Sequence, residues 1–461
     1  MRFATRALVL AALLVLPAGA AADPLAALAA ANGHPAATHV RLTWSATIER
    51  RRYVMTVDRE GTRSLSRLCV SEACSGRWFD GTRGWEYGLN DVALPADDGS
   101  DARQRTVAAI VSLAFAEPAF RASGGTVEPA GPSAWRVRAA GGTPLVAAFD
   151  SATLGLREIR EPDGTLVERF PGAVRAGGVR VAVDDPLRPG GALDGVAVVA
   201  EPLRPPAGAA ATFAGDPDVA LGNDAIPIVP CTLGGRAARC LLDSGATPSA
   251  ITLPLAEALH LEARGELELS GYSRFATGFV DAGPLAVGGA RFAAARFAVI
   301  PSLAAAKFDV VVGADLLARV RVVFDRASRR VTIGEPDRAA AAGIPLRFVN
   351  GTPHVAVTLD GRTADALFDS GDAAIVSLGY AQYRVGTPWP VVERLQAFGI
   401  AGTADAFVVA VPQVVVGTIP LGALRATVAR TQDGVHVGYG LASRCAVMLD
   451  EARERLSCGG R

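Results

Sequence analysis

The sequence predicts a mainly β protein in which two similar halves follow a β-rich N-terminal domain. Two segments in the C-terminal half repeat one another in register. Apolar and polar residues alternate along 40–49, and this period of two is typical of a strand with one buried face. Turn-forming pairs such as Asp80-Gly81 recur through the N-terminal part, as expected where tight turns join short strands.

The chain has 461 residues, of which 50% are apolar, and this length exceeds what one compact core accommodates. A stretch rich in Pro, Gly and Ala marks a boundary before the repeated halves. One helix is expected in the N-terminal domain, at 101–115, with Pro118 helping to end it. The predicted organisation is a signal peptide at 1–22, a β-rich domain at 23–200, a linker at 201–224, a first lobe at 225–340 and a second lobe at 341–461.

The N-terminus is typical of a secretory signal peptide. Arg2 and Arg6 form a charged start, an apolar run follows at 7–16, and cleavage would fall after Ala22. A membrane anchor is the alternative, but the run is too short to span a bilayer comfortably. We therefore expect a periplasmic or secreted protein without a stable membrane anchor after signal cleavage.

Six cysteines form three local pairs, and an even count in an exported chain favours disulfides over free buried thiols. Centring the hairpin loops places the partners of two pairs directly opposite each other, within the Cα separation that a disulfide spans. The same operation sets Val357 opposite Ala366 and Val320 opposite Ile333. The candidate disulfides are Cys69 with Cys74, Cys231 with Cys240, and Cys445 with Cys458.

The internal repeat carries the functional prediction. Residues 232–245 and 358–371 match at an offset of 126, and each segment ends in Asp-Ser-Gly. The halves match again at an offset of 125, where 310–313 corresponds to 435–438. Register kept over more than ninety residues indicates a duplicated unit rather than two unrelated hairpins.

Asp243 and Asp369, one from each copy, are the candidate catalytic residues. Each ends an apolar strand, and a two-fold relation between the copies would bring both carboxylates together. Adjacent carboxylates cannot easily both ionise, so they share a proton and can activate a water against a peptide carbonyl. The supporting active-site turns are expected to consist of Ser244, Gly245, Ser370 and Gly371.

Composition and motifs exclude several other functions. The chain has 46 basic and 46 acidic residues, so no basic face for nucleic acid is implied. The cysteines and the five histidines lack metal-ligand spacing, and there is no P-loop or nucleophile elbow. The sequence therefore predicts no metal, no cofactor and no nucleic acid, with a protein or peptide as the substrate.

With these motifs, residues 225–461 resemble a bacterial aspartyl protease of the retropepsin/pepsin clan. The resemblance implies an aspartic endopeptidase, a hydrolase, with two pseudo-symmetric acid-protease-like β-barrel lobes that each give one aspartate. A flap is expected near 271–278, with a counterpart near 398–402. The carrying motifs are Leu241-Leu242-Asp243-Ser244-Gly245-Ala246-Thr247, Leu367-Phe368-Asp369-Ser370-Gly371, Val311-Val312-Gly313-Ala314-Asp315 and Val437-Gly438-Tyr439-Gly440-Leu441.

The second motif departs from the family at Asp372, where a small or hydroxyl residue is usual. An additional carboxylate there would raise the pKa of its neighbours, or it would point to solvent and have no effect. This departure leaves open a catalytically decayed protease-fold protein that binds a peptide or lipid ligand in the periplasm.

The N-terminal domain has its own resemblance, carried by 79–85 and 149–156. These segments resemble the half-barrel of periplasmic lipoprotein carriers, which implies a curved sheet able to hold an apolar ligand. The alternative is that its aromatic residues are ordinary core. A further hypothesis is that residues 23–200 are a prosegment, removed by cleavage near 207–214.

Overall fold

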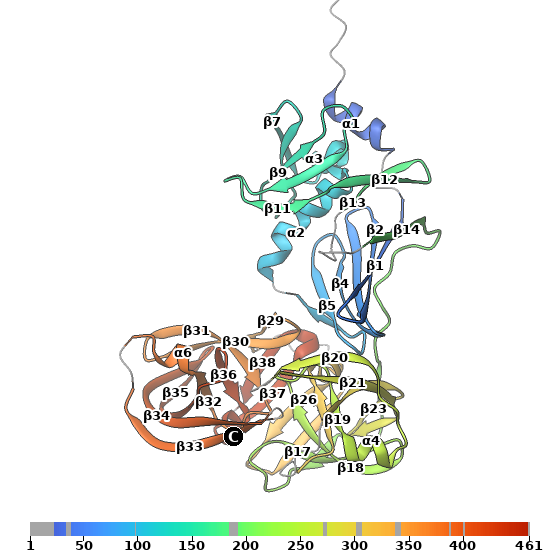
Figure 1. Cartoon of the computed structure of the whole chain (residues 1–461). Helices are drawn as coiled ribbons and strands as arrows, with labels where there is room; N and C mark the ends of the chain where they lie inside the picture. The colour runs from blue at the N-terminus through green and yellow to red at the C-terminus, as the bar shows by residue number, and fades with distance from the viewer. Residues whose placement is uncertain are drawn as a thin grey trace, which may run out of the picture.

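The structure is a computed structural model, and the protein is mainly β, as predicted. Two lobes lie side by side, and the N-terminal sheets are stacked against them from one side (Figure 1). The predicted signal peptide lies outside the described residues. No helix in the described part of the chain has the length and apolar character needed to cross a bilayer. The residues described are 23–33, 38–96, 98–183, 192–270, 274–300, 307–336, 343–386, 389–399 and 402–459.

The N-terminal domain contains a seven-stranded antiparallel sheet, in the order β14-β1-β2-β3-β4-β5-β6. The expected strand at 40–49 is β1, whose apolar side chains are buried on one face. The strands are β1 (Val40–Ile48), β2 (Arg51–Glu60), β3 (Arg63–Val70), β4 (Ala73–Phe79), β5 (Gly84–Tyr87), β6 (Ala93–Pro95) and β14 (Ala192–Val198).

A second sheet packs with the helices of this domain around a separate core. Its five strands are β7 (Thr126–Gly131), β8 (Ala134–Arg138), β9 (Leu145–Phe149), β10 (Leu156–Arg160) and β11 (Leu166–Arg169), and β12 (Gly172–Ala176) pairs with β13 (Val179–Val183). The helices are α1 (Pro24–Asn32), α2 (Asp98–Val111), the 3-10 helix η2 (Ala114–Ala116) and α3 (Pro118–Ala122).

The helix prediction was therefore only partly correct. The helix α2 ends at Val111, before the predicted end, and Pro118 begins α3 instead of ending the preceding helix. This position suits proline, because the first helical residue needs no backbone N–H partner inside the helix.

The first lobe is built on a ten-stranded sheet, in the order β15-β23-β22-β17-β18-β25-β19-β24-β21-β20. Its strands are β15 (Ala211–Phe213), β17 (Ile228–Leu233), β18 (Arg236–Asp243), β19 (Ala250–Thr252), β20 (Arg264–Ser270), β21 (Arg274–Ala282), β22 (Leu285–Val287), β23 (Ala290–Phe292), β24 (Ala295–Ile300) and β25 (Val310–Gly313). Two short helices, α4 (Leu253–Ala258) and α5 (Ala314–Leu317), follow β19 and β25.

The second lobe repeats this plan with eight strands, in the order β29-β30-β31-β36-β32-β35-β34-β33. Its strands are β29 (Arg347–Val349), β30 (Thr352–Leu359), β31 (Arg362–Asp369), β32 (Val376–Gly379), β33 (Val391–Gly399), β34 (Gly402–Val416), β35 (Ile419–Ala429) and β36 (Val435–Gly438). The helix α6 (Tyr380–Tyr383) follows β32, and the 3-10 helix η3 (Tyr439–Ser443) follows β36.

A six-stranded sheet joins the lobes, in the order β16-β27-β26-β37-β38-β28. At its centre Val323 pairs with Met448, its own counterpart at the offset of 125, and Val322 pairs with Leu449. This exchange of equivalent partners is what an approximate two-fold axis produces. The strands are β16 (Asp218–Ala220), β26 (Arg321–Asp325), β27 (Arg330–Gly334), β28 (Ile344–Pro345), β37 (Ala446–Asp450) and β38 (Arg455–Gly459), with the 3-10 helix η4 (Glu451–Arg453) between the last two.

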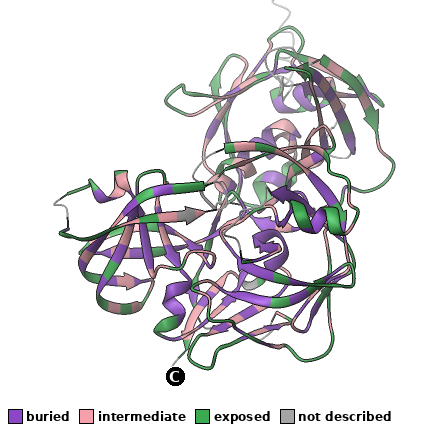
Figure 2. Ribbon diagram, turned by 60° about the horizontal axis from the view of Figure 1, so that its bottom comes forward, coloured by how far each residue is buried: buried purple, intermediate pink, exposed green. Residues whose placement is uncertain are grey.

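The main core is continuous across both lobes, and buried strands form the interior of each (Figure 2). Residues 201–224, predicted to be a linker, contribute two strands to the lobes. The strand β15 pairs with β23, and β16 pairs with β27. The expected flaps correspond to the hairpins β20–β21 and β33–β34, but residues 271–273 and 400–401 at their tips lie outside the described residues.

The cysteines are joined in the three expected pairs. Cys69 lies directly opposite Cys74, with Cα atoms 4.0 Å apart. The predicted registers of the other hairpins were wrong by two residues. Cys231 faces Ala238 rather than Cys240, and its disulfide joins diagonal neighbours with Cα atoms 5.9 Å apart.

The same two-residue shift affects the other three predicted pairs. Val447, rather than Cys445, faces Cys458, while Val355 faces Ala366 and Val322 faces Ile333. An even shift keeps each side chain on the same face of its sheet, so the cysteines can still reach each other.

We expect the disulfide in β17–β18 to stabilise the first lobe. Replacing both Cys231 and Cys240 with alanine opens a loop of sequence separation 9, and should lower the opening free energy of this hairpin by about 2–3 kcal/mol. Hydrogen exchange of peptides from β17 and β18 measures this loss. The paired replacement of Cys445 and Cys458 is the control, because it should change exchange in β37–β38 only. Unaltered exchange in β17–β18 would contradict the prediction.

Candidate active site

Asp243 and Asp369 end equivalent strands at the seam between the lobes. Asp243 is the last residue of β18 and pairs with Gly313 of the parallel strand β25. Asp369 is the last residue of β31 and pairs with Gly438 of the parallel strand β36. The duplication therefore brings both predicted aspartates to the same place in their lobes, each at the start of a tight Asp-Ser-Gly turn.

The serines of the two turns exchange hydrogen bonds across the seam. The backbone N–H of Ser244 donates to Oγ of Ser370 at 2.9 Å, and the N–H of Ser370 donates to Oγ of Ser244 at 3.0 Å. Each hydroxyl also donates to a strand carbonyl of the other lobe. The Ser244 hydroxyl donates to the carbonyl of Phe368 at 2.6 Å, and the Ser370 hydroxyl donates to that of Leu242 at 2.8 Å. Both serines are fully buried, so these four bonds fix one turn relative to the other.

Glycine follows each serine because the opposite carboxyl group lies where a side chain would be. A β-carbon added to Gly245 would lie 2.6 Å from the carboxyl carbon of Asp369. One added to Gly371 would lie 2.6 Å from the carboxyl carbon of Asp243. The N–H groups of these glycines also hold the aspartates, by donating to Oδ1 of Asp243 at 3.0 Å and of Asp369 at 2.9 Å.

The carboxyl groups of Asp243 and Asp369 form a hydrogen bond with each other, and their pKa values are displaced in opposite directions. Burial raises the pKa of Asp243 well above its usual range, and the negative charge of Asp369 raises it further. Burial also tends to raise the pKa of Asp369, but contacts with His436, Asp243 and the Gly371 N–H outweigh it, so the net shift is downward. These surroundings therefore favour the shared proton on Asp243 rather than on Asp369.

The same backbone brace supports each active-site turn. The N–H of Ala314 donates to the carbonyl of Ala246 at 2.8 Å, and the N–H of Tyr439 donates to the carbonyl of Asp372 at 2.8 Å. The donors begin the short helices α5 and η3, which follow the two parallel strands. The crossing segments that the sequence singled out thus fix the position of both turns.

Asp372 does not point to solvent. Its Oδ1 accepts a hydrogen bond from the N–H of Ala374 at 2.8 Å, and its Oδ2 accepts one from the hydroxyl of Ser377. Burial raises the pKa of Asp372, and the charge of Asp369 raises it further. The net shift in the pKa of Asp369 is nevertheless downward, because a histidine lies beside that carboxylate.

That histidine is His436 of β36, which the sequence analysis did not single out. Its Nδ1 lies 3.4 Å from Oδ2 of Asp369. Burial lowers the pKa of His436, but the hydrogen bond and charge of Asp369 and the charge of Asp372 outweigh it, so the net shift is upward. The repeat could have revealed this residue, since its counterpart at the offset of 125 is Val311.

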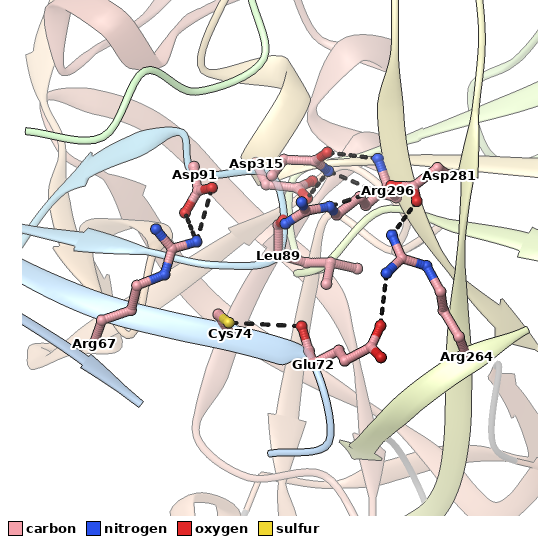
Figure 3. A network of polar contacts seen from close by, with 10 residues as sticks. Arg67, Glu72, Cys74, Leu89, Asp91, Arg264, Asp281, Arg296 and Asp315 are labelled. Carbon is pink, nitrogen blue, oxygen red and sulfur yellow. Dashed lines mark hydrogen bonds and ion pairs between the residues drawn. The ribbon is translucent and has the colours of Figure 1, made fainter. Parts of the chain in front are cut away.

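The N-terminal domain contacts the first lobe through Asn90 and through the ion pair of Glu72 with Arg264, which Figure 3 shows. The Asn90 amide donates to the buried carboxyl group of Asp315 at 2.7 Å and to the carbonyl of Arg296 at 2.9 Å, and accepts from the N–H of Arg296 at 2.7 Å. Asp315 also accepts the N–H and hydroxyl of Ser249, on the segment that follows the active-site turn. Asn90 therefore connects the N-terminal domain to the backbone next to Asp243.

Ion pairs surround this contact. Arg264 at the base of the first-lobe flap hairpin pairs with Glu72 at 2.7 Å, and Arg51 pairs with Glu266 at 2.6 Å. These side chains are more exposed than Asn90, so we expect each pair to contribute little to stability.

One cavity of about 210 Å³ lies between the seven-stranded sheet and α2, lined by apolar residues such as Met55 and Val107 and by polar residues such as Arg59 and Gln104. Typical small-molecule sites measure about 300–1,000 Å³. Among the described residues, no group of three or more His, Cys, Asp or Glu side chains could hold a metal ion.

The duplicated lobes, the paired parallel strands and the two facing aspartates define a protein with an acid-protease-like fold and a two-carboxylate site. Residues 229–316 match the model of the aspartyl protease family. This match supports a relationship of the first lobe to retropepsin-like aspartyl proteases. A search of curated proteins finds no match.

The solved structures that are similar to this chain include the following three. A retropepsin-like aspartic protease from Rickettsia conorii is 16% identical, with a TM-score of 0.20, and the match covers 27% of this chain and 93% of that one. Basic 7S globulin from soybean is 11% identical, with a TM-score of 0.29, covering 54% and 94%. Conglutin gamma, a basic 7S globulin from lupine seeds, is 12% identical, with a TM-score of 0.28, covering 54% and 96%.

We expect the serine contacts across the seam to stabilise both lobes. Ser244→Ala removes the hydroxyl that bonds the Phe368 carbonyl and leaves the buried N–H of Ser370 without its acceptor. Thermal unfolding should show a loss of about 1–3 kcal/mol. Ser328→Ala is the control, because its hydroxyl is exposed and bonds only locally to Asp325. Equal effects of the two substitutions would contradict this prediction.

We expect Asn90 to stabilise the contact between the N-terminal domain and the first lobe. Asn90→Ala leaves the N–H of Arg296 and a carboxyl oxygen of Asp315 without this partner, so thermal unfolding of the full chain should show a loss of about 1–3 kcal/mol. Glu72→Ala at the same interface removes an exposed ion pair and should cost less than about 1 kcal/mol. A larger loss in the Glu72 variant would refute this ranking.

Proposed function

We propose that this protein is an aspartic endopeptidase that hydrolyses peptide bonds with a water activated between Asp243 and Asp369. One observation carries the proposal: the carboxyl group of each aspartate lies against the glycine of the opposite turn, and the pKa values of the two aspartates are displaced in opposite directions. One carboxylate and one carboxylic acid side by side are the pair of groups that acid–base hydrolysis requires. The match of residues 229–316 to the aspartyl protease family supports the same function.

In the first step the ionised carboxylate of Asp369 accepts a proton from the water. The water oxygen bonds to the carbon of the peptide carbonyl, and the proton of Asp243 passes to the carbonyl oxygen. The product is a neutral tetrahedral diol, so no charged oxyanion has to be stabilised. Asp369 is now protonated and Asp243 is ionised, and the two residues have exchanged roles.

In the second step the diol collapses and the carbon–nitrogen bond breaks. Asp369 returns its proton to the leaving nitrogen, while Asp243 takes the proton of one diol hydroxyl as the new carboxylic acid forms. Both carboxyl groups are back in their starting states after the amine and acid leave. No covalent intermediate between enzyme and substrate forms at any stage.

The active-site turns act in this proposal as supports. Ser244 and Ser370 hold the turns against each other, and Gly245 and Gly371 allow the carboxyl groups to approach. Asp372 is held by Ser377 and by the Ala374 backbone, and this arrangement favours an active site over a decayed one. The three disulfides support an extracytoplasmic location, and we propose that the protein acts in the periplasm or as a secreted enzyme.

Replacing either aspartate should abolish hydrolysis without unfolding the protein. Asp243→Asn and Asp369→Asn keep the shape of the side chain and remove the proton exchange, so kcat should fall by about 10²–10⁴-fold or more. The assay is cleavage of a denatured protein, followed by mass spectrometry of the fragments. Asp365→Asn in the same lobe is the control and should cleave at a rate close to that of the wild type. Wild-type activity in either dyad variant would refute the assignment.

The pH profile should be bell-shaped. Activity requires Asp369 ionised and Asp243 protonated. Because the pKa of Asp369 is lowered, kcat/KM should rise with pH through a value below the usual aspartate range of about 3.9. Because the pKa of Asp243 is raised, kcat/KM should fall again only well above that range. A rate that keeps rising into the alkaline range would rule out the mechanism.

A further inference from the structure

The two lobes differ on the sheet face that lies beneath the flap hairpins. In the first lobe this face is a buried apolar cluster, against which the side chains of the flap strands β20 and β21 pack. Its members are Ile228, Leu241, Ala250, Ala298, Ile300, Phe308 and Val311. None of these side chains can hold or exchange a proton, so the cluster gives Asp243 no titratable partner.

Strand pairing gives the equivalent positions in the second lobe. Val311 pairs with Leu241 and Ala250, as His436 pairs with Leu367 and Ser377. By the same pairings, Ser377 replaces Ala250, His354 replaces Ile228, and Thr427 replaces Ala298.

Four apolar residues of one lobe are thus replaced by four polar residues in the other. Burying polar side chains costs free energy unless they find partners, so a polar set at these positions needs a compensating interaction or a role. Ser377 has such partners, because its hydroxyl donates to Asp372 and accepts from the amide of Gln432 at 2.9 Å.

His436 is the member of this set that contacts the dyad. Its Nδ1 lies 3.4 Å from Oδ2 of Asp369, and the two side chains are only 21% and 19% exposed. Asp243 has Val311 at the corresponding position. The pseudo-symmetry of the dyad is therefore broken at this position, and among the described residues Asp369, but not Asp243, has a histidine beside it.

Several titratable groups face His436 from the surrounding elements. Asp369 comes from β31 and Asp372 from the active-site turn, and both raise its pKa, as does a hydrogen bond with the backbone of Asp433 in the segment before β36. His354 on β30 faces it as well, but burial lowers the pKa of His354 despite its contact with Asp365 at 2.8 Å. Of the two histidines, His436 is therefore the one whose surroundings favour the protonated form, next to Asp369.

We propose that His436 is a positioning residue that assigns the two roles within the dyad. It keeps Asp369 ionised as the base that accepts the proton of the water, and so leaves the shared proton on Asp243, the acid. This assignment rests on the hydrolase function proposed above. It makes the two aspartates unequal before any substrate binds, although the lobes that carry them are related by an approximate two-fold axis.

The kinetic test replaces His436 with valine, the residue that the first lobe has at the equivalent position, Val311. In His436→Val the cation is lost, so the pKa of Asp369 should rise, and the acid limb of kcat/KM should move to higher pH by about 1–3 units. His354→Ile, which copies Ile228 of the first lobe in the same way, should leave this limb within about 0.3 units of the wild type. A residue with a merely structural role would lower the rate or the stability without moving the limb.

The proposal fails if the acid limb of His436→Val stays where it is in the wild type. It also fails if both variants move the limb equally, because the effect would then not depend on contact with Asp369. His436→Asn separates charge from hydrogen bonding, since its amide can still donate. If the acid limb of kcat/KM moves as far in His436→Asn as in His436→Val, the effect is due to the charge of His436.

A second measurement needs no activity and separates this inference from the proposed function. NMR titration of the imidazole signals, assigned by the signal missing in His436→Asn, should give His436 a pKa above the usual value of about 6.5. In Asp369→Asn this pKa should fall by about one unit or more, whereas in Asp243→Asn it should stay raised. If the wild type hydrolyses no substrate but the titration behaves in this way, the hydrolase function is wrong and the charge assignment stands. The inference would be overturned if the pKa of His436 is at or below 6.5 and does not change in Asp369→Asn.

Discussion

The hydrogen bonds that Ser244 and Ser370 exchange across the seam are the contact on which the rest of the site depends. Each serine satisfies a buried N–H and a buried carbonyl of the other lobe, so neither turn can move independently. A shift of either turn would separate the carboxyl groups and leave four buried polar groups without partners. The six-stranded sheet that joins the lobes supports the same arrangement over a longer distance.

Duplication brings the two aspartates together, and divergence between the copies makes them different. Two carboxyl groups in identical surroundings would have equal affinities for the shared proton. Here the first lobe offers Val311 and the second offers His436, so the electrostatic environment favours one protonation state. The N-terminal domain adds a further asymmetry, because Asn90 bonds Asp315, which in turn holds Ser249 in the segment after the first of the two turns.

Much of this arrangement could be predicted from the repeat. Two Asp-Ser-Gly segments in register were enough to predict two similar lobes and the pair Asp243 and Asp369. The predicted registers of the hairpins β17–β18 and β30–β31 were wrong because their turns were assumed to have four residues, whereas each has two. Gly234-Gly235 and Asp360-Gly361 all have positive φ, as two-residue hairpin turns with the twist of the flanking strands require. This signal was present in the sequence.

Other features could not be predicted because they depend on contacts between distant segments. Asn90 and Asp315 are 225 positions apart, and no local sequence pattern indicates that Asn90 donates a hydrogen bond to Asp315. His436 corresponds to Val311 in the repeat. A repeat is recognised from the residues that match, so this difference between the copies did not identify His436 as a site residue. A difference between duplicated segments, here histidine for valine beside an aspartate, points to the residue that changes the chemistry.

A neutron crystal structure of the unliganded protein near neutral pH tests the central claim most directly, because it locates protons on carboxyl groups. We predict that the carboxyl groups of Asp243 and Asp369 lie within hydrogen-bonding distance, with a single proton between them that belongs to Asp243. His436 should be protonated on both ring nitrogens and face Asp369. Carboxyl groups that are well separated, or that face away from each other, would contradict this account of the protein.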